Sequence, residues 1–204
     1  FSQIDKLAAE AGPFDFILAD LGVSSMQIDN PERGFSYKND GPLDLRLNPL
    51  QGISAAERLR SIAQDELEGM LIENSDEPYA REIARQIVAD LRHGVKIETT
   101  GSLHAEVEKA LLYEKMTAAE RKEAVKKSSA RTFQALRIDV NHEFEVLYDF
   151  MEKLPAALAA GGRAAILTFH SGEDRLVKQA FKEYHRQGVY REIARDVIRP
   201  SAAE

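Results

Sequence analysis

Cysteine is absent from the 204-residue sequence. Disulfides and thiolate metal sites are therefore excluded, and the absence favours a cytoplasmic protein, because disulfides belong to oxidising compartments. The five histidines are scattered without the spacing that metal ligands show, so we expect no metal site. They are His93, His104, His142, His170 and His185.

Long apolar runs are also absent, and none approaches the roughly 20 residues that a membrane-spanning helix requires. There is no basic segment followed by a short apolar run, so we expect neither export nor a membrane partner. The net charge of −7 argues against nonspecific coating of nucleic acid, which depends on many phosphate contacts. Locally, seven basic residues stand against two acidic ones from Lys115 to Arg137, a pattern also typical of a solvated helix surface.

A glycine-rich turn between a strand and a helix is the third absence. Sheets that bind nucleotide-like cofactors normally carry such a turn after their first strand. A cofactor-binding sheet built by this sequence would lack that loop.

Phe14–Gln27 is the segment around which the rest of the sequence is organised. Residues 16–19 are apolar without polar alternation, which predicts a strand buried on both faces of a parallel sheet. Asp20 follows at the carboxyl end of this strand. Because ligands of open α/β sheets bind beyond the carboxyl ends of the strands, Asp20 is a candidate site residue.

A second apolar run, residues 163–169, is followed by His170, Ser171 and Gly172. If the two strands are parallel neighbours, His170 and Ser171 open into the same crevice as Asp20. Serine, histidine and aspartate together suggest a hydrolase. That alternative is weak, because the nucleophile elbow G-x-S-x-G is absent and Met26 stands where its second glycine would be.

Between the strands the pattern becomes helical. Apolar spacing of three and four residues predicts four helices, and a further helix over residues 139–160 ends at two glycines. The four begin near Ser54, Pro78, Thr100 or Ser102, and Thr117, and the last is short. Successive helices interrupt strand–helix alternation, so we expect an α/β core (residues 1–50 and 128–204) with an inserted helical subdomain (51–127).

A long polar loop spans residues 28–48. Loops of this length in compact domains are usually functional or disordered, and the aromatic and arginine content of this one favours function. Arg33, Phe35 and Tyr37 have planar side chains that can stack on unpaired bases, which predicts contacts with RNA. The alternative is an ordered surface loop without such a role.

A third cluster occupies residues 131–137. On a helix, Arg131, Gln134 and Arg137 would share a face and suit contacts with phosphates and base edges. The alternative is a capped helix start after Ser128 and Ser129, with Phe133 in the core.

Four motifs follow one another along the chain: DLGVSS-x-Q, ERGFSY with DGPLDLR, ARTFQALRI, and GGRAAILTFHS with EDR. In this order they resemble the bacterial small-subunit ribosomal RNA cytosine-N4 methyltransferase family along the whole chain. The resemblance implies a Rossmann-like class I methyltransferase core, a helical insert (here residues 51–127) that recognises rRNA, and S-adenosyl-L-methionine as the cofactor. It also implies an enzyme that methylates the exocyclic N4 amine of a decoding-centre cytidine in 16S rRNA.

The same resemblance assigns Phe1, Asp20 and Gln27 to the cofactor site. The family's glycine-rich cofactor loop has no counterpart in the sequence and would precede Phe1. Gly172 departs from the family, which commonly has leucine there, and this indicates a divergent branch.

The chemistry of the target adds catalytic expectations. The N4 amine is a poor nucleophile because its lone pair is conjugated with the ring, so a site must orient it and accept a hydrogen bond from its N–H. Asp20 is the predicted acceptor, and His170 with Ser171 is predicted to shape the pocket wall. The expected partner is 16S rRNA in the small ribosomal subunit, and a homodimer is compatible with the sequence. The alternative is a non-catalytic RNA-binding or ribosome-assembly protein on the same scaffold.

Overall fold

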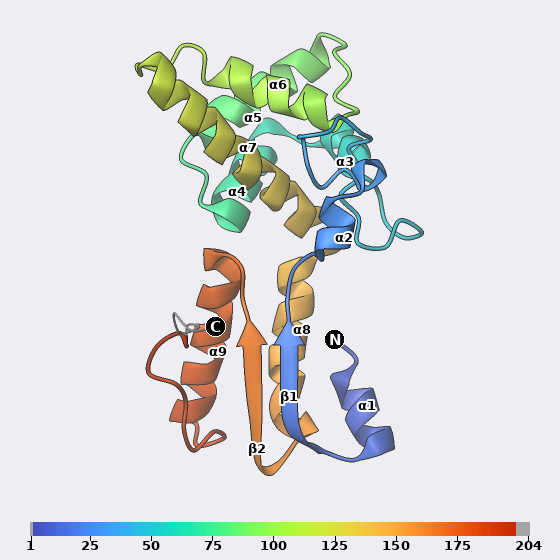
Figure 1. The fold of residues 1–204 in the computed structure, drawn as a ribbon, viewed down its shortest axis with the longest axis vertical. Coiled ribbons are helices and arrows are strands. Elements are labelled where there is room, and N and C mark those ends of the chain that lie inside the picture. Colours follow the sequence, from blue (N-terminus) through green and yellow to red (C-terminus); the bar gives the residue numbers. More distant parts are fainter. Residues whose placement is uncertain (1, 199–204) are drawn as a thin grey trace. The chain divides into compact units, whose positions relative to one another are not determined.

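The computed structural model describes residues 2–198, which form two compact units (Figure 1). The α/β unit contains the chain up to Gly22 and from Phe144 onward, and the helical unit is Val23–Glu143. Each unit has a hydrophobic core of its own. The predicted α/β core with a helical insert is confirmed.

The boundaries of the helical unit correct the predicted ones at residues 50 and 127. The polar loop 28–48 belongs to the helical unit, because Leu43 and Leu45 are each only 1% exposed in its core. Burying a leucine stabilises a fold by roughly 1.5–3 kcal/mol, enough to fix an irregular segment to a helical core. At the other end, the last helix of the insert continues to Asn141.

The α/β unit consists of two strands and three helices in the described part of the chain. In chain order these are α1 (Ile4–Ala11), β1 (Phe14–Asp20), α8 (Glu143–Ala157), β2 (Leu158–Leu167) and α9 (Ser171–Arg186). β1 and β2 pair in parallel, with Asp20 opposite Leu167, and their arrows point the same way in Figure 1. The two predicted strands and their parallel arrangement are confirmed, although β2 begins at Leu158 rather than at residue 163.

Only one face of this sheet is buried. Ile17 and Ala19 pack into the core formed with α8 and α9, whereas Phe16 and Leu18 point the other way and are 59% and 58% exposed. The prediction of a strand buried on both faces is therefore wrong for the described residues. Successive side chains of a strand point to opposite faces, so a helix layer on one side buries every second residue only.

The helix predicted over residues 139–160 is also corrected. A break divides it at His142, which adopts a left-handed conformation with φ of 51° between α7 and α8. Residues 158–160 belong to β2, and Gly161, which was expected to end a helix, lies within that strand. Apolar residues spaced three and four positions apart predict helix on both sides of His142. This spacing does not reveal that one residue between the two helices is left-handed.

The helical unit contains a group of helices joined by irregular segments. They are α2 (Ser25–Ile28), the short 3-10 helix η1 (Pro31–Arg33), α3 (Ala55–Ser61), α4 (Gln64–Ser75), α5 (Ala80–Arg92), α6 (Thr100–Ala110) and α7 (Ala118–Asn141). The apolar faces of α3 to α7 meet in one core, in which Leu67, Ile83 and Leu103 are fully buried.

Local capping signals located several helix starts correctly. The predicted capping box of Ser54 and Glu57 begins α3, and that of Thr117 and Glu120 begins α7. α6 is capped by Thr99 rather than by Thr100 or Ser102; the Thr99 side chain accepts a hydrogen bond from Ser102 N. α5 begins at Ala80, two residues after Pro78.

α7 corrects the prediction of a short helix followed by a new helix start. It runs without interruption for 24 residues, and Ser128 and Ser129 lie buried inside it instead of capping a new helix. Phe133 lies in the core, as the alternative reading expected. The polar residues in the middle of α7 are therefore partners of neighbouring elements.

An aromatic cluster fixes the chain after α9. The ring of Tyr190 lies edge-on to those of Phe181 and Tyr184, at centroid distances of 5.6 and 5.9 Å. Its hydroxyl is buried and has no hydrogen-bond partner among the described residues. Burial, with a smaller contribution from Tyr184, raises the pKa of Tyr190 to about 12.

Replacing Tyr190 by phenylalanine should therefore protect the α/β unit against alkali. The folded-state pKa is above the unfolded value, so the stability that protonated Tyr190 contributes is complete below about pH 10 and is lost as the pH rises towards 12. Urea unfolding of the wild type and Tyr190→Phe at pH 8 and at pH 11 measures this. The wild type should lose more stability than the variant; equal losses would contradict the assignment.

Candidate functional site

The carboxyl ends of β1 and β2 lie at the same edge of the sheet. Asp20 is opposite Leu167, and Leu21 N donates to Leu167 O at 3.3 Å just beyond the strand. The polar loops that follow Asp20 and residue 167 therefore start side by side. These are the loops that were predicted to share a crevice. This edge is the candidate functional site of the α/β unit.

Asp20 presents a free carboxylate at this edge. It is exposed, and its side chain makes no hydrogen bond or ion pair with any residue from 2 to 198. Two residues later Gly22 has a φ of +83°, a conformation that favours glycine and turns the chain away from the strand. An unpaired carboxylate at a strand end is available to a ligand.

His170 sits at the start of α9 and fastens the second loop. Its Nδ1 accepts a hydrogen bond from Glu173 N at 3.4 Å. Its Nε2 lies 3.4 Å from Glu173 Oε1, an ion-pair distance without hydrogen-bond geometry. Glu173 Oε2 in turn accepts from Phe169 N at 2.8 Å. This geometry gives His170 a structural role, while the catalytic roles of His170 and of the exposed Ser171 stay predictions.

Gly172 has a steric explanation in this chain. A Cβ at this position would stand 2.6 Å from Cζ of Phe144, and the Phe144 ring also packs against His170 at a centroid distance of 5.9 Å. The leucine common in the family would therefore force the Phe144 ring to move. Glycine at 172 and phenylalanine at 144 fit one another.

The other two predicted cofactor residues lie elsewhere. Gln27 belongs to the helical unit, where its Oε1 accepts from Ser24 N at 3.0 Å and completes the capping box of α2. Phe1 lies outside the described residues. Both assignments stay predictions.

In the predicted RNA-binding loop, Arg33 holds the loop together. Its Nη2 donates to the main-chain oxygens of Arg46 at 2.8 Å and Leu47 at 3.0 Å. Its guanidinium also lies over the ring of Phe35, 5.7 Å from the centroid, as in a cation–π contact. The Nη2 group of Arg33 and one face of Phe35 are thus engaged within the protein, whereas Arg33 Nε is buried without a hydrogen-bond partner among the described residues.

Tyr37 is packed rather than free to stack on a base. Its ring is stacked on that of His104, with centroids 4.5 Å apart and planes 6° from parallel, and Phe133 packs against it at 5.6 Å. His104 Nδ1 is 2.7 Å from Ser129 Oγ on α7. Tyr37 thus joins its loop to α6 and α7, and its contact with RNA stays a prediction.

Asp40, which the sequence analysis did not single out, fixes the same loop. Its Oδ1 accepts from Gly101 N at 2.7 Å and from Thr100 Oγ1 at 3.3 Å, at the start of α6. The hydrogen bond from Gly101 N is the main cause that lowers the pKa of Asp40 below its usual value. The sequence could not predict this contact, because nothing in the residues around Asp40 indicates a hydrogen bond to a helix that begins 60 residues later.

The predicted RNA-binding face of α7 is largely occupied by internal contacts. Gln134 Nε2 donates to Asn74 O at 3.0 Å, and Arg137 forms a two-pronged ion pair with Glu143 at 2.7 and 3.0 Å. Arg131 is the exception, with a side chain 39% exposed and 4.0 Å from Glu77. The Arg137 side chain is only 14% exposed, so of the two arginines Arg131 is the more accessible to solvent.

A hollow of about 350 Å³ lies beside Arg131 in the helical unit. Buried next to it is Glu77, whose Oε1 accepts from Ser128 Oγ at 2.8 Å and from Tyr79 N at 3.0 Å. The hollow is lined by Pro78, Tyr79, Glu120, Glu123, Ala124, Lys127, Ser128 and Arg131. The lining carries both signs of charge and does not select an anionic ligand.

Residues 2–198 contain no group of three histidine, aspartate or glutamate side chains that could hold a metal ion. No helix in this part of the chain is sufficiently long and apolar to cross a membrane.

Two parallel strands with an exposed, unpaired carboxylate at their carboxyl ends, separated in sequence by a helical unit, define an α/β protein with a helical insert. Sequence comparison gives the particular family. The chain belongs to the MraW methylase family, whose sequence model matches residues 1–203.

Curated relatives agree with this family. The chain is 64% identical over 204 residues to "Ribosomal RNA small subunit methyltransferase H 1" of Lachnoclostridium phytofermentans, covering all of this chain and 55% of the relative. The protein of the same name from Agathobacter rectalis is also 64% identical, with 58% of its length covered. "Ribosomal RNA small subunit methyltransferase H" of Thioalkalivibrio sulfidiphilus is 44% identical over 181 residues, which cover 55% of its length. The chain thus spans about half the length of the curated relatives it matches.

The packing of the loop 28–48 predicts a sharp difference between two glycines of the helical unit. A Cβ at Gly41 would collide with the main-chain oxygen of Pro31, whereas one at Gly69, within α4, would meet nothing within 4 Å. Gly41→Ala should destabilise the unit by about 1–3 kcal/mol through overpacking. Gly69→Ala should stabilise it by about 0.5–1 kcal/mol through helix propensity. Thermal unfolding followed by circular dichroism measures both, and an unchanged midpoint for Gly41→Ala would show that the loop is not held in this way.

Proposed function

We propose that this protein transfers a methyl group from S-adenosyl-L-methionine to the exocyclic N4 amine of a decoding-centre cytidine in 16S rRNA. The observation that carries the proposal is the family match over residues 1–203, with relatives at 64% identity named as small-subunit rRNA methyltransferases. The resemblance of the four motifs to the cytosine-N4 family supports the choice of this base and this atom. Because ribosomal subunits are cytoplasmic in bacteria, this is also the proposed compartment, and a homodimer is the proposed assembly.

The chemistry of Asp20 fits this cofactor. S-adenosyl-L-methionine carries a positive sulfonium and an ammonium group, and Asp20 offers an exposed carboxylate without an ion-pair partner among the described residues. Opposite charges at short range attract, and a carboxylate free of internal partners loses no existing contact on binding. Gln27 and Phe1 are the other residues proposed to hold the cofactor, which supplies the activated methyl group when bound.

Asp20 is also the proposed hydrogen-bond acceptor for the target amine. Methyl transfer requires the nitrogen lone pair to point along the line of the transferred carbon, and accepting a hydrogen bond from the N–H holds that orientation. It also assists loss of the proton as the nitrogen becomes positively charged. An exposed carboxylate at the end of β1 can do both only for a base that has left its stack.

His170 is proposed as a positioning residue. Its contacts with Glu173 and Phe144 hold the start of α9 next to the end of β2, and Ser171 follows directly on α9. The loop at the sheet edge is thereby kept in one conformation beside Asp20. In the helical unit, Arg131 is the member of the predicted RNA set best placed to meet a phosphate, because its side chain is 39% exposed.

Substitution of Asp20 tests the proposal. The protein, expressed with the sequence that flanks it in its gene, is assayed for transfer of labelled methyl groups to 30S subunits. Asp20→Ala should lower the rate by at least 100-fold, the lower range for loss of a group that assists proton transfer. Asp15→Ala, an exposed aspartate of the same strand, is the matched control and should retain wild-type activity. Near-normal methylation by Asp20→Ala would remove Asp20 from the mechanism.

His170→Ala should give a different pattern. Loss of the helix cap should destabilise the α/β unit by about 0.5–2 kcal/mol, and the methylation rate should fall less than in Asp20→Ala. Thermal unfolding and the methylation assay, run on the same preparation, separate the two effects. A rate loss equal to that of Asp20→Ala at unchanged stability would assign His170 to the chemistry instead of to positioning.

A further inference from the structure

The connection between α6 and α7 carries an unusually exposed aromatic side chain. Tyr113 is 88% exposed, and its neighbour Leu112 is 49% exposed. Tyr113 is the only exposed phenylalanine or tyrosine in the helical unit, all of whose residues, 23–143, are described. The aromatics predicted to stack on RNA, Phe35 and Tyr37, are packed against the core of this unit.

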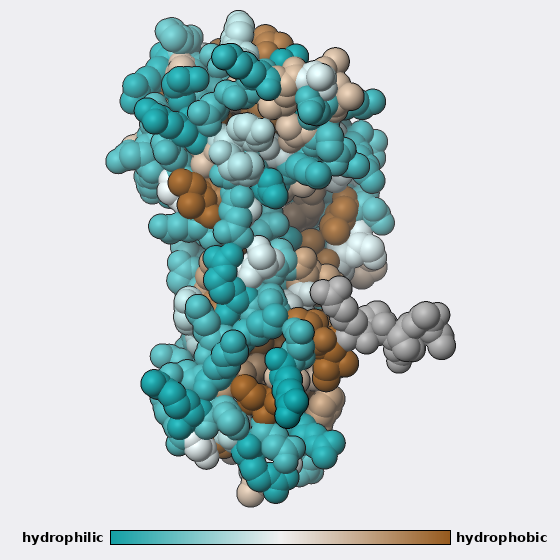
Figure 2. All heavy atoms as spheres, turned by 90° about the vertical axis from the view of Figure 1, so that its left-hand side faces the viewer, coloured by the Kyte–Doolittle hydropathy of each residue, from teal (hydrophilic) through white to brown (hydrophobic). Residues whose placement is uncertain are grey.

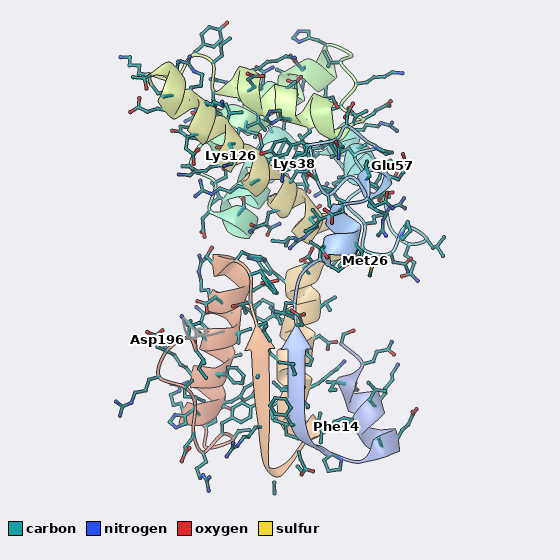
Figure 3. The ribbon with its side chains drawn as sticks, viewed as in Figure 1. Phe14, Met26, Lys38, Glu57, Lys126 and Asp196 are labelled. Carbon is teal, nitrogen blue, oxygen red and sulfur yellow. The ribbon has the colours of Figure 1, made fainter. Side chains whose placement is uncertain are left out.

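Three lysines without ion-pair partners accompany Tyr113. Lys115 lies in the same connection, and Lys122 and Lys126 are one helical turn apart on the first half of α7, where Figure 3 labels Lys126. All three are exposed, and none forms an ion pair within the described part of the chain. The whole chain has a net charge of −7, so these unpaired lysines are a local concentration of positive charge.

Three carboxylates lie close to these lysines in sequence, and none of them forms an ion pair with Lys115, Lys122 or Lys126: they are Glu114, Glu120 and Glu123. Glu120 is held in the capping box of α7, where it accepts from Thr117 N at 2.8 Å. Glu123 pairs with Lys127 at 3.4 Å. Lys115, Lys122 and Lys126 therefore keep their positive charge available to a partner.

The connection is held in place rather than loosely attached. Arg121, in the first turn of α7, donates from Nε to Leu111 O at 3.2 Å and from Nη2 to Glu114 O at 3.1 Å. Leu111 itself is fully buried. These contacts fix the backbone on both sides of Tyr113 against the first turn of α7, so Tyr113 and Lys115 are held close to the start of the helix that carries Lys122.

We propose that Tyr113, Lys115, Lys122 and Lys126 form a contact surface for single-stranded RNA, in which the Tyr113 ring stacks on an unpaired base and the lysines meet the flanking phosphates. An exposed ring beside unpaired cations is the combination that binds unpaired nucleic acid, because every base has a face to stack and every nucleotide has a charge. The surface in Figure 2 is predominantly hydrophilic over the helical unit, which suits a charged polymer better than an apolar partner. The inference rests on the proposed function in one respect, namely that RNA is the substrate.

Binding of a fluorescently labelled single-stranded oligoribonucleotide from the decoding region of 16S rRNA tests the surface directly. Tyr113→Ala should weaken binding about tenfold, the usual size of one base–aromatic stack. The triple change Lys115→Gln, Lys122→Gln and Lys126→Gln should lower the slope of log affinity against log salt by about two, since each phosphate contact to a single strand contributes roughly 0.7. Both variants alter exposed side chains and should unfold at the wild-type temperature.

Matched controls come from exposed positions outside this surface. Tyr148→Ala removes another exposed tyrosine, which is 58% exposed on α8. The triple change Lys6→Gln, Lys96→Gln and Lys182→Gln removes the same charge from three exposed lysines that form no ion pair among the described residues. These controls should bind the oligonucleotide as the wild type does.

Methylation of 30S subunits separates this inference from the proposed function. The surface variants should raise the KM for 30S subunits about tenfold and leave kcat unchanged, because the surface contains none of the residues proposed to act in the methyl transfer. If the surface variants bind RNA more weakly but the wild type transfers no methyl group, the surface is supported and the proposed function is refuted. If the wild type transfers methyl groups and the variants keep its KM and its affinity for the oligonucleotide, the proposed surface is overturned and the proposed function is not.

Two further outcomes would also overturn it. A wild-type protein that does not bind the single strand has no such surface. An increase in the KM for 30S subunits with unchanged affinity for the oligonucleotide would show that these residues contact a ribosomal protein instead of RNA.

Discussion

The parallel pairing of β1 with β2 is the interaction on which the rest of the structure depends. The paired residues Asp20 and Leu167 are far apart in the chain, and the helical unit lies between them in sequence. Closing so long a loop costs conformational entropy, although that cost grows only slowly with loop length. The shared core of Ile17 and Ala19 with α8 and α9 offsets it. The pairing brings the ends of two distant segments to one sheet edge, and without it Asp20 and His170 would not belong to one site.

The family motifs serve the fold as much as the chemistry. In the segment ERGFSY and the following DGPLDLR, Arg33 ties main-chain oxygens together and Leu43 and Leu45 enter the core of the helical unit. Tyr37 and Asp40 join the loop to α6 through stacking and hydrogen bonds. Planar and charged side chains in a long loop are typical of ligand contacts. The same side chains can instead form hydrogen bonds with buried backbone groups and pack a loop that lacks regular backbone hydrogen bonding.

The two units divide the proposed work between them. The α/β unit offers a free carboxylate at a sheet edge whose second loop is fixed by His170 and Glu173. The helical unit offers a surface on which cations and one aromatic ring remain unpaired. Unpaired groups are the informative ones in both cases, because a charged group without internal partners binds an external one without first breaking a contact.

Elements with local signals could be predicted from the sequence. They are the strand ending at Asp20, the parallel α/β class, the helical character of the insert and the capping boxes at Ser54 and Thr117, because each depends on neighbouring residues and their side-chain periodicity. The tertiary structure alone decided which polar side chains are free. Arg137, Gln134 and Tyr37 find partners on other elements, while Asp20 and Tyr113 find none among the described residues, and the face of β1 with Phe16 and Leu18 is left uncovered there. These outcomes depend on contacts between residues remote in sequence, and single-residue features such as the left-handed His142 depend on the packing of both helices that it joins.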